Sequence, residues 1–161
     1  MAEGLEIRAA QPGDESVILS LIRELAEYEN LLHEVVATEA DLAGSLFGES
    51  PPAEVLVGEV EGDIVAFALF FHTYSTFEGR HCLYLEDLYV QPIYRGRGIG
   101  RAFLRRLAGL ALERGCARFE WAALDWNEPA IRVYRGIGAR AMDEWTTFRL
   151  DGSALRDFAE R

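Results

Sequence analysis

The chain has 161 residues, of which 50% are hydrophobic, enough to bury one core but too few for two ordinary domains, so we expect a single domain over residues 1–161. Its formal net charge of −11 argues against nucleic acid and anionic membranes as partners. The charge is compatible with a cationic substrate, and a well-solvated acidic surface explains it equally well.

The first residues of the chain and its cysteine content indicate the cellular compartment that we expect for the protein. Met1-Ala2-Glu3-Gly4 lacks the basic and apolar regions of a signal peptide, and no apolar run approaches the length of a membrane span. The two cysteines, Cys82 and Cys116, are too few for a disulfide framework, which fits a reducing environment. We therefore expect a cytoplasmic protein without a membrane partner.

The first third of the chain predicts one strand and two helices. Residues 5–10 alternate as a strand does, and Asp14 is placed to cap a helix with apolar residues at helical spacing. The face of this helix that we expect to be exposed carries Glu24, Glu27 and Glu29. Thr38 and Asp41 resemble a capping box and predict a second helix that runs toward residue 47.

The middle of the chain predicts a hairpin and a further strand. Residues 54–60 and 64–71 form its two arms, and the continuously apolar second arm is typical of a central strand covered on both faces. A polar loop over residues 72–81 should then lead into a strand over residues 82–90.

The last third predicts a helix from residue 99 to near Gly115, a short strand over 118–123 and a helix that Asn127 can cap. A last strand is expected over 145–150 and a short terminal helix over 153–161. Strands and helices are mixed around one sheet, so the fold class is α/β or α+β.

Between the strand over 82–90 and the next helix lies a glycine loop, Tyr94-Arg95-Gly96-Arg97-Gly98-Ile99-Gly100-Arg101. Such a loop can direct backbone N–H groups and a helix N-terminus at one anion, and its arginines favour a phosphate or pyrophosphate. The alternative is a glycine-rich turn with solvated arginines.

Two common nucleotide motifs do not fit this loop. The dinucleotide fingerprint G-x-G-x-x-G fails because Arg101 stands where the third glycine is needed. A P-loop fails because no Gly-Lys-Ser/Thr follows.

The loop segment Arg95-Gly96-Arg97-Gly98-Ile99-Gly100 matches the Arg/Gln-x-x-Gly-x-Gly/Ala pattern that binds acetyl-CoA in the GCN5-related N-acetyltransferase (GNAT) family. Before it stands Leu85-Glu86-Asp87-Leu88-Tyr89-Val90, and after it Trp126-Asn127-Glu128-Pro129-Ala130 with Tyr134. On these residues the chain resembles that family, closest to its spermidine/spermine (diamine) and thialysine N-acetyltransferase branch. Leu25-Ala26-Glu27-Tyr28-Glu29 is similar to the same branch.

The resemblance implies a GNAT fold, a single mixed, mostly antiparallel twisted sheet flanked by helices in the order β-α-α-β-β-β-α-β-α-β-β. It implies acetyl-CoA as co-substrate without a metal, a small cationic amine as substrate, and a homodimer. The residues that would hold acetyl-CoA are Leu88, Val90, Arg95, Gly96, Arg97, Gly98, Ile99, Gly100, Arg101, Asn127 and Tyr134. Among them, the loop amides and the Arg95 guanidinium would bind the pyrophosphate. The main-chain groups of Leu88 and Val90 would pair with the pantetheine arm, and a backbone N–H near Val90 would donate to the oxyanion.

Acetyl transfer to an amine requires a base, because an alkylamine with a pKa of roughly 10.4 is protonated near pH 7. Glu86 is the candidate base, acting directly or through a water, since a carboxylate in an otherwise apolar strand is costly to bury without a role. Asp87 is expected to hold the cationic amine, although alternation along a strand sends neighbouring side chains to opposite faces. A bulge in this strand, as the family has, would bring both near the site. An ion pair with a basic neighbour is the alternative for Glu86.

Tyr134 is the candidate general acid, because its hydroxyl is protonated at neutral pH and can donate toward the departing sulfur. It follows Asn127 by seven residues, about two helical turns, so both point along one face. Packing against the core is the alternative for Tyr134, and helix capping explains Asn127 equally well.

The cysteines and the three histidines, His33, His72 and His81, support no acyl-cysteine chemistry and no metal site, because their spacing in the chain matches neither. We expect packing or surface roles for all five.

The acceptor site is expected near the end of the first helix, where Tyr28 and Glu29 join Glu86 and Asp87 as substrate-binding candidates. Polyamine-specialised relatives carry an aspartate and a tryptophan in the loop where this chain has Thr76 and Glu78. That departure favours a smaller amine, such as thialysine, a lysine-like amino acid or a short diamine. The alternatives are an acetyl-CoA-binding sensor without turnover and a protein N-terminal acetyltransferase.

Overall fold

The computed structural model describes residues 3–161, so Met1 and Ala2, which open the segment without signal-peptide features, lie outside the described residues. The chain divides into two compact units, Met1–Ala122 and Ala123–Arg161. The expectation of a single domain over residues 1–161 stays a prediction.

Within the described part of the first unit, five strands form one sheet. They are β1 (Leu5–Ala9), β2 (Glu54–Val60), β3 (Asp63–Ser75), β4 (Arg80–Val90) and β5 (Phe119–Trp121). The strands lie side by side in chain order; β1 to β4 pair antiparallel, and β5 pairs parallel with β4. The expected mixed, mostly antiparallel sheet is therefore confirmed.

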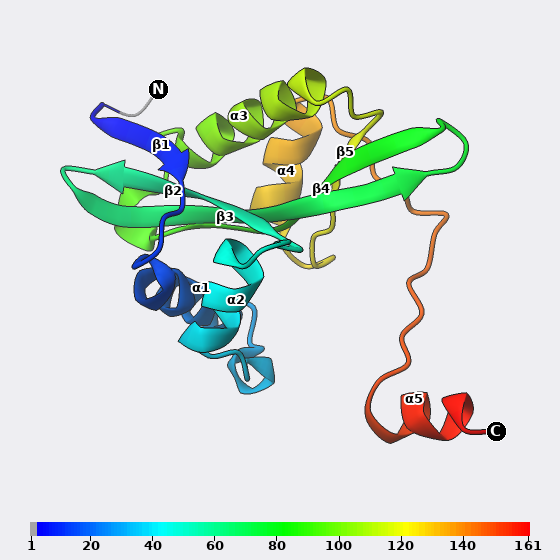
Figure 1. Ribbon diagram of the computed structural model, residues 1–161. Coiled ribbons are helices and arrows are strands. Elements are labelled where there is room, and N and C mark those ends of the chain that lie inside the picture. Colours follow the sequence, from blue (N-terminus) through cyan, green and yellow to red (C-terminus); the bar gives the residue numbers. More distant parts are fainter. Residues whose placement is uncertain (1–2) are drawn as a thin grey trace. The chain divides into compact units, whose positions relative to one another are not determined.

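Helices cover both faces of this sheet (Figure 1). The first unit contains α1 (Glu15–Tyr28), η1 (Leu32–Glu34), α2 (Glu39–Phe47), η2 (Pro92–Tyr94) and α3 (Ile99–Glu113). Helices α1 and α2 lie on one face, and α3 lies on the other (Figure 1). The expected capping box starts α2, since Thr38 Oγ1 accepts from the Asp41 N–H and the Asp41 carboxylate accepts from the Thr38 N–H.

The core on the α1 side combines residues from two helices and three strands. Ile18 of α1, Val57 of β2 and Phe67 of β3 are completely buried, and Tyr89 of β4 completes the cluster. The apolar residues of α1, spaced three and four apart, form one face of the helix, and this face packs against the side chains that alternate strand residues direct toward it.

Helix α3 approaches the opposite face closely at Gly58 of β2. A Cβ atom at position 58 would lie 2.9 Å from Cε2 of Phe103, whose side chain is completely buried. Glycine at this position therefore lets the ring lie directly on the strand.

The expected polar loop over residues 72–81 is wrong. The ladder continues through Thr73↔Cys82 to Ser75↔Arg80, so β3 and β4 form one long hairpin that closes in a short turn. This part of the hairpin faces solvent, so His72 and Tyr74 are exposed and the segment has the polar sequence that is typical of a loop.

In the second unit, α4 (Glu128–Gly136) and α5 (Gly152–Ala159) confirm the two expected helices. The expected strand over 145–150 is wrong, because no residue of that segment pairs as a strand within the described chain. A strand requires a ladder partner, and Trp145 and Phe148 remain 77% and 91% exposed.

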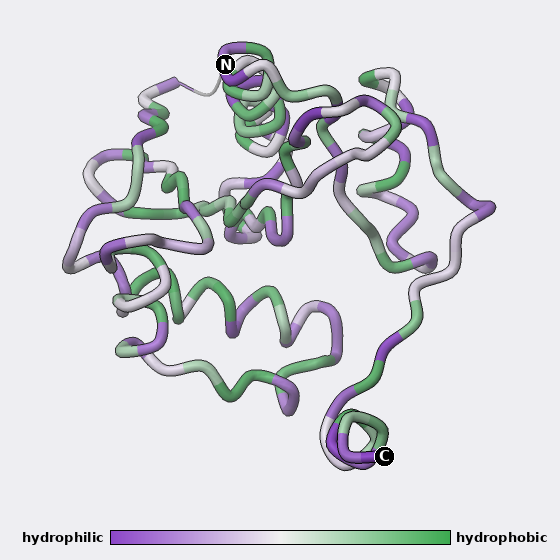
Figure 2. Tube along the Cα trace, turned by 45° about the vertical axis from the view of Figure 1, so that its right-hand side comes forward, coloured by the Kyte–Doolittle hydropathy of each residue, from purple (hydrophilic) through white to green (hydrophobic). Residues whose placement is uncertain are grey.

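The order therefore lacks the last two strands that the resemblance implied. Figure 2 views α5 almost end-on and shows hydrophobic and hydrophilic residues on different sides of it. None of the helices in residues 3–161 is long and apolar enough to cross a membrane.

Candidate active site

A bulge in β4 sets the position of the two candidate carboxylates. Leu69 of β3 pairs with Asp87 and the next residue, Phe70, pairs with Leu85, so Glu86 is the extra residue. The bulge that the resemblance suggested in this strand is thus confirmed.

The two carboxylates differ in burial, and the premise that Glu86 is buried is wrong, because the bulge leaves it exposed. Asp87 is partly buried, and its burial, together with the charges of Glu86 and Glu29, raises its pKa from 3.8 to about 6. The carboxyl that is poised to titrate near neutrality is therefore Asp87.

The third member of this group comes from the end of α1. Glu29 is the C-cap residue of α1, and burial raises its pKa above the usual value. Its charge acts on Asp87, which lies two residues before Tyr89 on the face of the sheet that α1 covers. We call Glu29, Glu86 and Asp87 the acidic cluster. The residue before Glu29 is Tyr28, whose side chain is 39% exposed.

Glu24 also differs from expectation, because it is partly buried and joins α1 to the end of β4. Its carboxylate accepts hydrogen bonds from Tyr89 Oη at 3.1 Å and Gln91 Nε2 at 3.2 Å. From the sequence, Glu24 was expected on the solvated face of α1. The local sign that it faces the site is its position one helical turn before Tyr28, on the same side of the helix.

Beyond the acidic cluster, β4 has an open edge. Its pairing with β5 ends, among the described residues, at Leu85↔Trp121, directly before the bulge. The Gln91 N–H donates to Val65 O on β3, so strand alternation turns the main-chain groups of Leu88 and Val90 toward the open side.

The glycine loop follows this open edge. Gly96 and Gly98 have φ values of 76° and 80°, the left-handed region that favours glycine, and Gly98 is the N-cap of α3. The Gly100 amide and its neighbours in the first turn have no partner within the helix. Gly96, Arg97 and Gly98 are exposed, so the loop can present its amides to an anion.

Arg95 points back toward the strand rather than along the loop. Its Nε donates to Val90 O at 2.8 Å, and its guanidinium lies 5.1 Å from the ring centroid of Tyr28 and 5.3 Å from that of Tyr89. In this conformation Arg95 joins the end of α1 to the end of β4, while Arg97 lies over Tyr94 at 5.3 Å. Arg101 remains exposed in the first turn of α3.

In the second unit, Asn127 and Tyr134 lie on α4 and its N-cap. Asn127 occupies the N-cap position, but its side chain makes no capping hydrogen bond, which leaves capping as a weaker explanation for this residue. Tyr134, two turns later, is partly buried, and its carbonyl accepts the N–H of Ala139.

Residues 19–139, three quarters of the chain, match the acetyltransferase (GNAT) family. The chain belongs to this family. It is an acetyl-CoA-dependent acyltransferase, and the exposed amide loop at the start of α3 suits the co-substrate's pyrophosphate.

Relatives agree with this assignment along almost the whole chain. A thialysine N-epsilon-acetyltransferase of Sus scrofa is 44% identical over 95% of this chain and 96% of its own length. A spermidine/spermine N(1)-acetyltransferase-like protein 1 of Homo sapiens is 37% identical over 96% of this chain, which spans 24% of that protein. An integron cassette protein of V. cholerae superimposes with a TM-score of 0.82 at 26% identity, covering 99% of both chains.

Proposed function

We propose that this GNAT protein transfers the acetyl group of acetyl-CoA directly to the primary amine of a small, lysine-like cationic substrate, with thialysine first among the candidates. The observation that carries the proposal is the acidic cluster, Glu29, Glu86 and Asp87, beside the open edge of β4. The thialysine acetyltransferases at 42–44% identity support the same substrate class.

The acidic cluster favours a cation for an electrostatic reason. The charges of Glu86 and Glu29 both raise the pKa of Asp87, which means that the three carboxylates repel one another. A bound ammonium relieves this repulsion, whereas a neutral or anionic acceptor does not. Tyr28 lies next to Glu29 and adds an aromatic surface for the substrate's alkyl chain.

Asp87 is the better candidate to remove the proton from the amine, with Glu86 and Glu29 holding the cation. In the free protein its pKa of about 6 lies about two units closer to that of an alkylamine than the pKa of an ordinary aspartate does, and burial, the largest cause of the rise, favours acceptance of a proton. Glu86 is exposed and can pass the proton on to solvent.

The remaining roles follow the order of bonds made and broken. The deprotonated amine nitrogen attacks the thioester carbonyl carbon, the Val90 N–H on the open side of β4 donates to the oxyanion, and the C–S bond breaks. Tyr134 Oη then donates a proton to the departing sulfur, and the second proton that the nitrogen loses on becoming an amide restores the Tyr134 hydroxyl through water. Asn127 binds the co-substrate from the same side of α4.

The co-substrate is held by main-chain groups at two places. The open side of Leu88 offers pairing to the amide groups of the pantetheine arm, and the Val90 carbonyl joins it by its second lone pair, beside the hydrogen bond from Arg95 Nε. The amides from Gly96 to Arg101 and the dipole of α3 bind the pyrophosphate, with Arg97 and Arg101 adding charge. Arg95 fixes the end of β4 in the free protein, and it would have to leave the Tyr28 and Tyr89 rings to bind the pyrophosphate.

An acceptor screen tests the proposal. The purified protein is incubated with acetyl-CoA and, separately, thialysine, lysine, ornithine, putrescine, spermidine and a peptide with a free N-terminus, and mass spectrometry follows the acetylated product. We expect a small amino acid or short diamine to be the best acceptor. Acetyl-CoA binding without any acetylated product would support the sensor alternative, and acetylation of the peptide alone would support N-terminal acetylation; either result contradicts the proposal.

We further propose a homodimer in a reducing, cytoplasmic compartment. The segment over 145–150 carries exposed Trp145 and Phe148 and has no strand partner within residues 3–161, so a second copy could supply one. The two free cysteines fit the compartment. Light scattering on the full chain checks the dimer, and a monomer at micromolar concentration would contradict it.

A further inference from the structure

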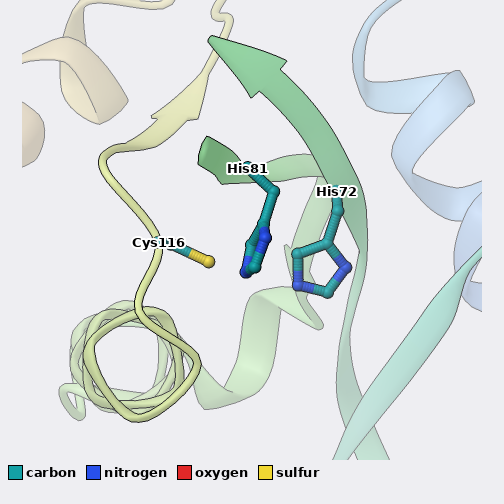
Figure 3. Close-up of side chains that lie close together, drawn as sticks. All are labelled: His72, His81 and Cys116. Carbon is teal, nitrogen blue, oxygen red and sulfur yellow. The ribbon is translucent and has the colours of Figure 1, made fainter. Parts of the chain in front are cut away.

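Three potential metal ligands meet in the first unit near the C-terminal end of α3, whose N-terminal end follows the glycine loop. His72 of β3, His81 of β4 and Cys116, which follows α3, each offer a donor atom, and these atoms lie within 4.8 Å of one another (Figure 3). Spacing along the chain does not predict this group, because eight residues lie between the two histidines and Cys116 follows much later. The extended hairpin brings them together by pairing His72 with Leu83 and Tyr74 with His81, which makes the two histidines diagonal neighbours.

The donor set and spacing fit a tetrahedral metal. Two imidazoles and one thiolate are common ligands of Zn²⁺, and bond lengths of about 2.0–2.3 Å place donor atoms roughly 3.3–3.8 Å apart. The donor atoms, which lie within 4.8 Å of one another, need to approach by about 1 Å to bind one ion. Cys116 is buried while His72 is exposed, so one side of the group is shielded and the other is accessible.

The surroundings also suit a metal ligand set. His81 Nε2 lies 3.0 Å from the Arg114 carbonyl oxygen, so in the tautomer protonated at Nε2 it donates there and leaves Nδ1 free. Arg114 Nη1 can only donate in its long 3.4 Å contact with His72 Nε2, so a metal bound at Nε2 replaces this contact, and Glu54 still holds and neutralises the guanidinium through two hydrogen bonds of 2.6 and 2.9 Å. The arginine's positive charge is therefore compensated locally.

We propose that His72, His81 and Cys116 form a Zn²⁺ site with a fourth position open to water. The site joins the tip of the β3–β4 hairpin to the segment after α3, and the 15 residues of α3 place it about 22 Å from the glycine loop. It therefore stabilises this end of the sheet and takes no part in acetyl transfer. Zinc that binds only the folded chain raises its stability with ligand concentration.

Cobalt substitution tests the site by a signal that acetyl transfer does not produce. The metal-free full chain is titrated with Co²⁺ and then with competing Zn²⁺, and the near-ultraviolet thiolate-to-cobalt band is recorded. We expect one equivalent to bind, the band to vanish in Cys116→Ser, and affinity to fall at least tenfold in His72→Gln. His33→Gln, an exposed histidine elsewhere, and Cys82→Ala, the other free cysteine, serve as matched controls that should retain the band.

Thermal unfolding with and without Zn²⁺ gives a second readout. His72 is exposed, so His72→Gln should fold even if Cys116→Ser does not, and it should lose the zinc-dependent rise in Tm that the unsubstituted protein shows. A protein with no thiolate-to-cobalt band and no rise in Tm at one equivalent of metal would overturn the site. Equal loss of the band in Cys82→Ala would overturn the assignment of Cys116.

Discussion

Replacing Asp87 with asparagine should stabilise the fold in a pH-dependent way while reducing acetyl transfer. The folded pKa of Asp87 is raised from 3.8 to about 6, because burial and the charges of Glu86 and Glu29 disfavour the carboxylate. The folded state therefore holds the proton more tightly than the unfolded state, and stability falls as pH rises from about 3.8 to about 6. A rise of about two units corresponds to about 3 kcal/mol, reached in full above pH 6.

Urea unfolding at several pH values measures this effect. The stabilisation of Asp87→Asn relative to the unsubstituted protein should be about 3 kcal/mol larger above pH 6 than below pH 4, because any cost of the buried amide is the same at every pH. Asp63→Asn, at the exposed first residue of β3, is the matched control and should show no such dependence. A difference that does not change between pH 4 and pH 7 would refute the reasoning about Asp87.

Four further outcomes are expected. In the unsubstituted enzyme, kcat/KM should rise with pH through about 6, the pKa of Asp87, and pH–rate profiles that stay flat from pH 5 to 8 would exclude it as the base. Gly98→Ala forces alanine to φ 80°, at a cost of about 1–2 kcal/mol, so the KM for acetyl-CoA should rise several-fold in steady-state assays. Gly58→Ala should lower the unfolding free energy by about 1–3 kcal/mol, because its Cβ meets a buried phenyl ring, whereas Gly44→Ala, in open helical space, should raise it slightly. Arg8 donates two hydrogen bonds to the Asp14 carboxylate, at 2.8 and 3.3 Å, and lowers its pKa. Asp14→Asn should therefore cost about 1–2 kcal/mol of unfolding free energy at pH 7, and that cost should shrink as the pH falls from 3.8 through the lower folded pKa.

Local signals predicted those parts of the fold that depend on neighbouring residues. The Thr38–Asp41 capping box, the β2–β3 hairpin and the helix after the glycine loop rest on contacts within a few residues, and the structure confirms each. The bulge at Glu86 followed from the family resemblance and was confirmed by the ladder register.

Features that depend on contacts between residues far apart in the chain could not be predicted from the local sequence pattern. The exposed residues of the extended hairpin read as a loop because their ladder partners lie on another strand. Glu24 and Glu29 were expected on a solvated helix face, because nothing in the sequence of α1 indicates that Tyr89 and Asp87 lie near it. The conformation of Arg95 depends likewise on rings from α1 and β4.

The acidic cluster is the feature on which the proposed substrate class depends, and a change of charge there tests it. Glu29→Gln removes one of its charges, and Glu27→Gln, two residues earlier on the same helix and exposed, is a matched control. Removing one carboxylate near a bound ammonium is worth about 1 kcal/mol, or roughly fivefold.

The most direct measurement compares kcat/KM for a short diamine with that for the monoamine of equal chain length, in the unsubstituted enzyme and in both variants. We predict that the unsubstituted enzyme prefers the diamine, that Glu29→Gln lowers this preference about fivefold, and that Glu27→Gln leaves it unchanged. Both amines carry the reacting ammonium near pH 7, so equal kcat/KM for the two in the unsubstituted enzyme would contradict recognition of a second positive charge by this site.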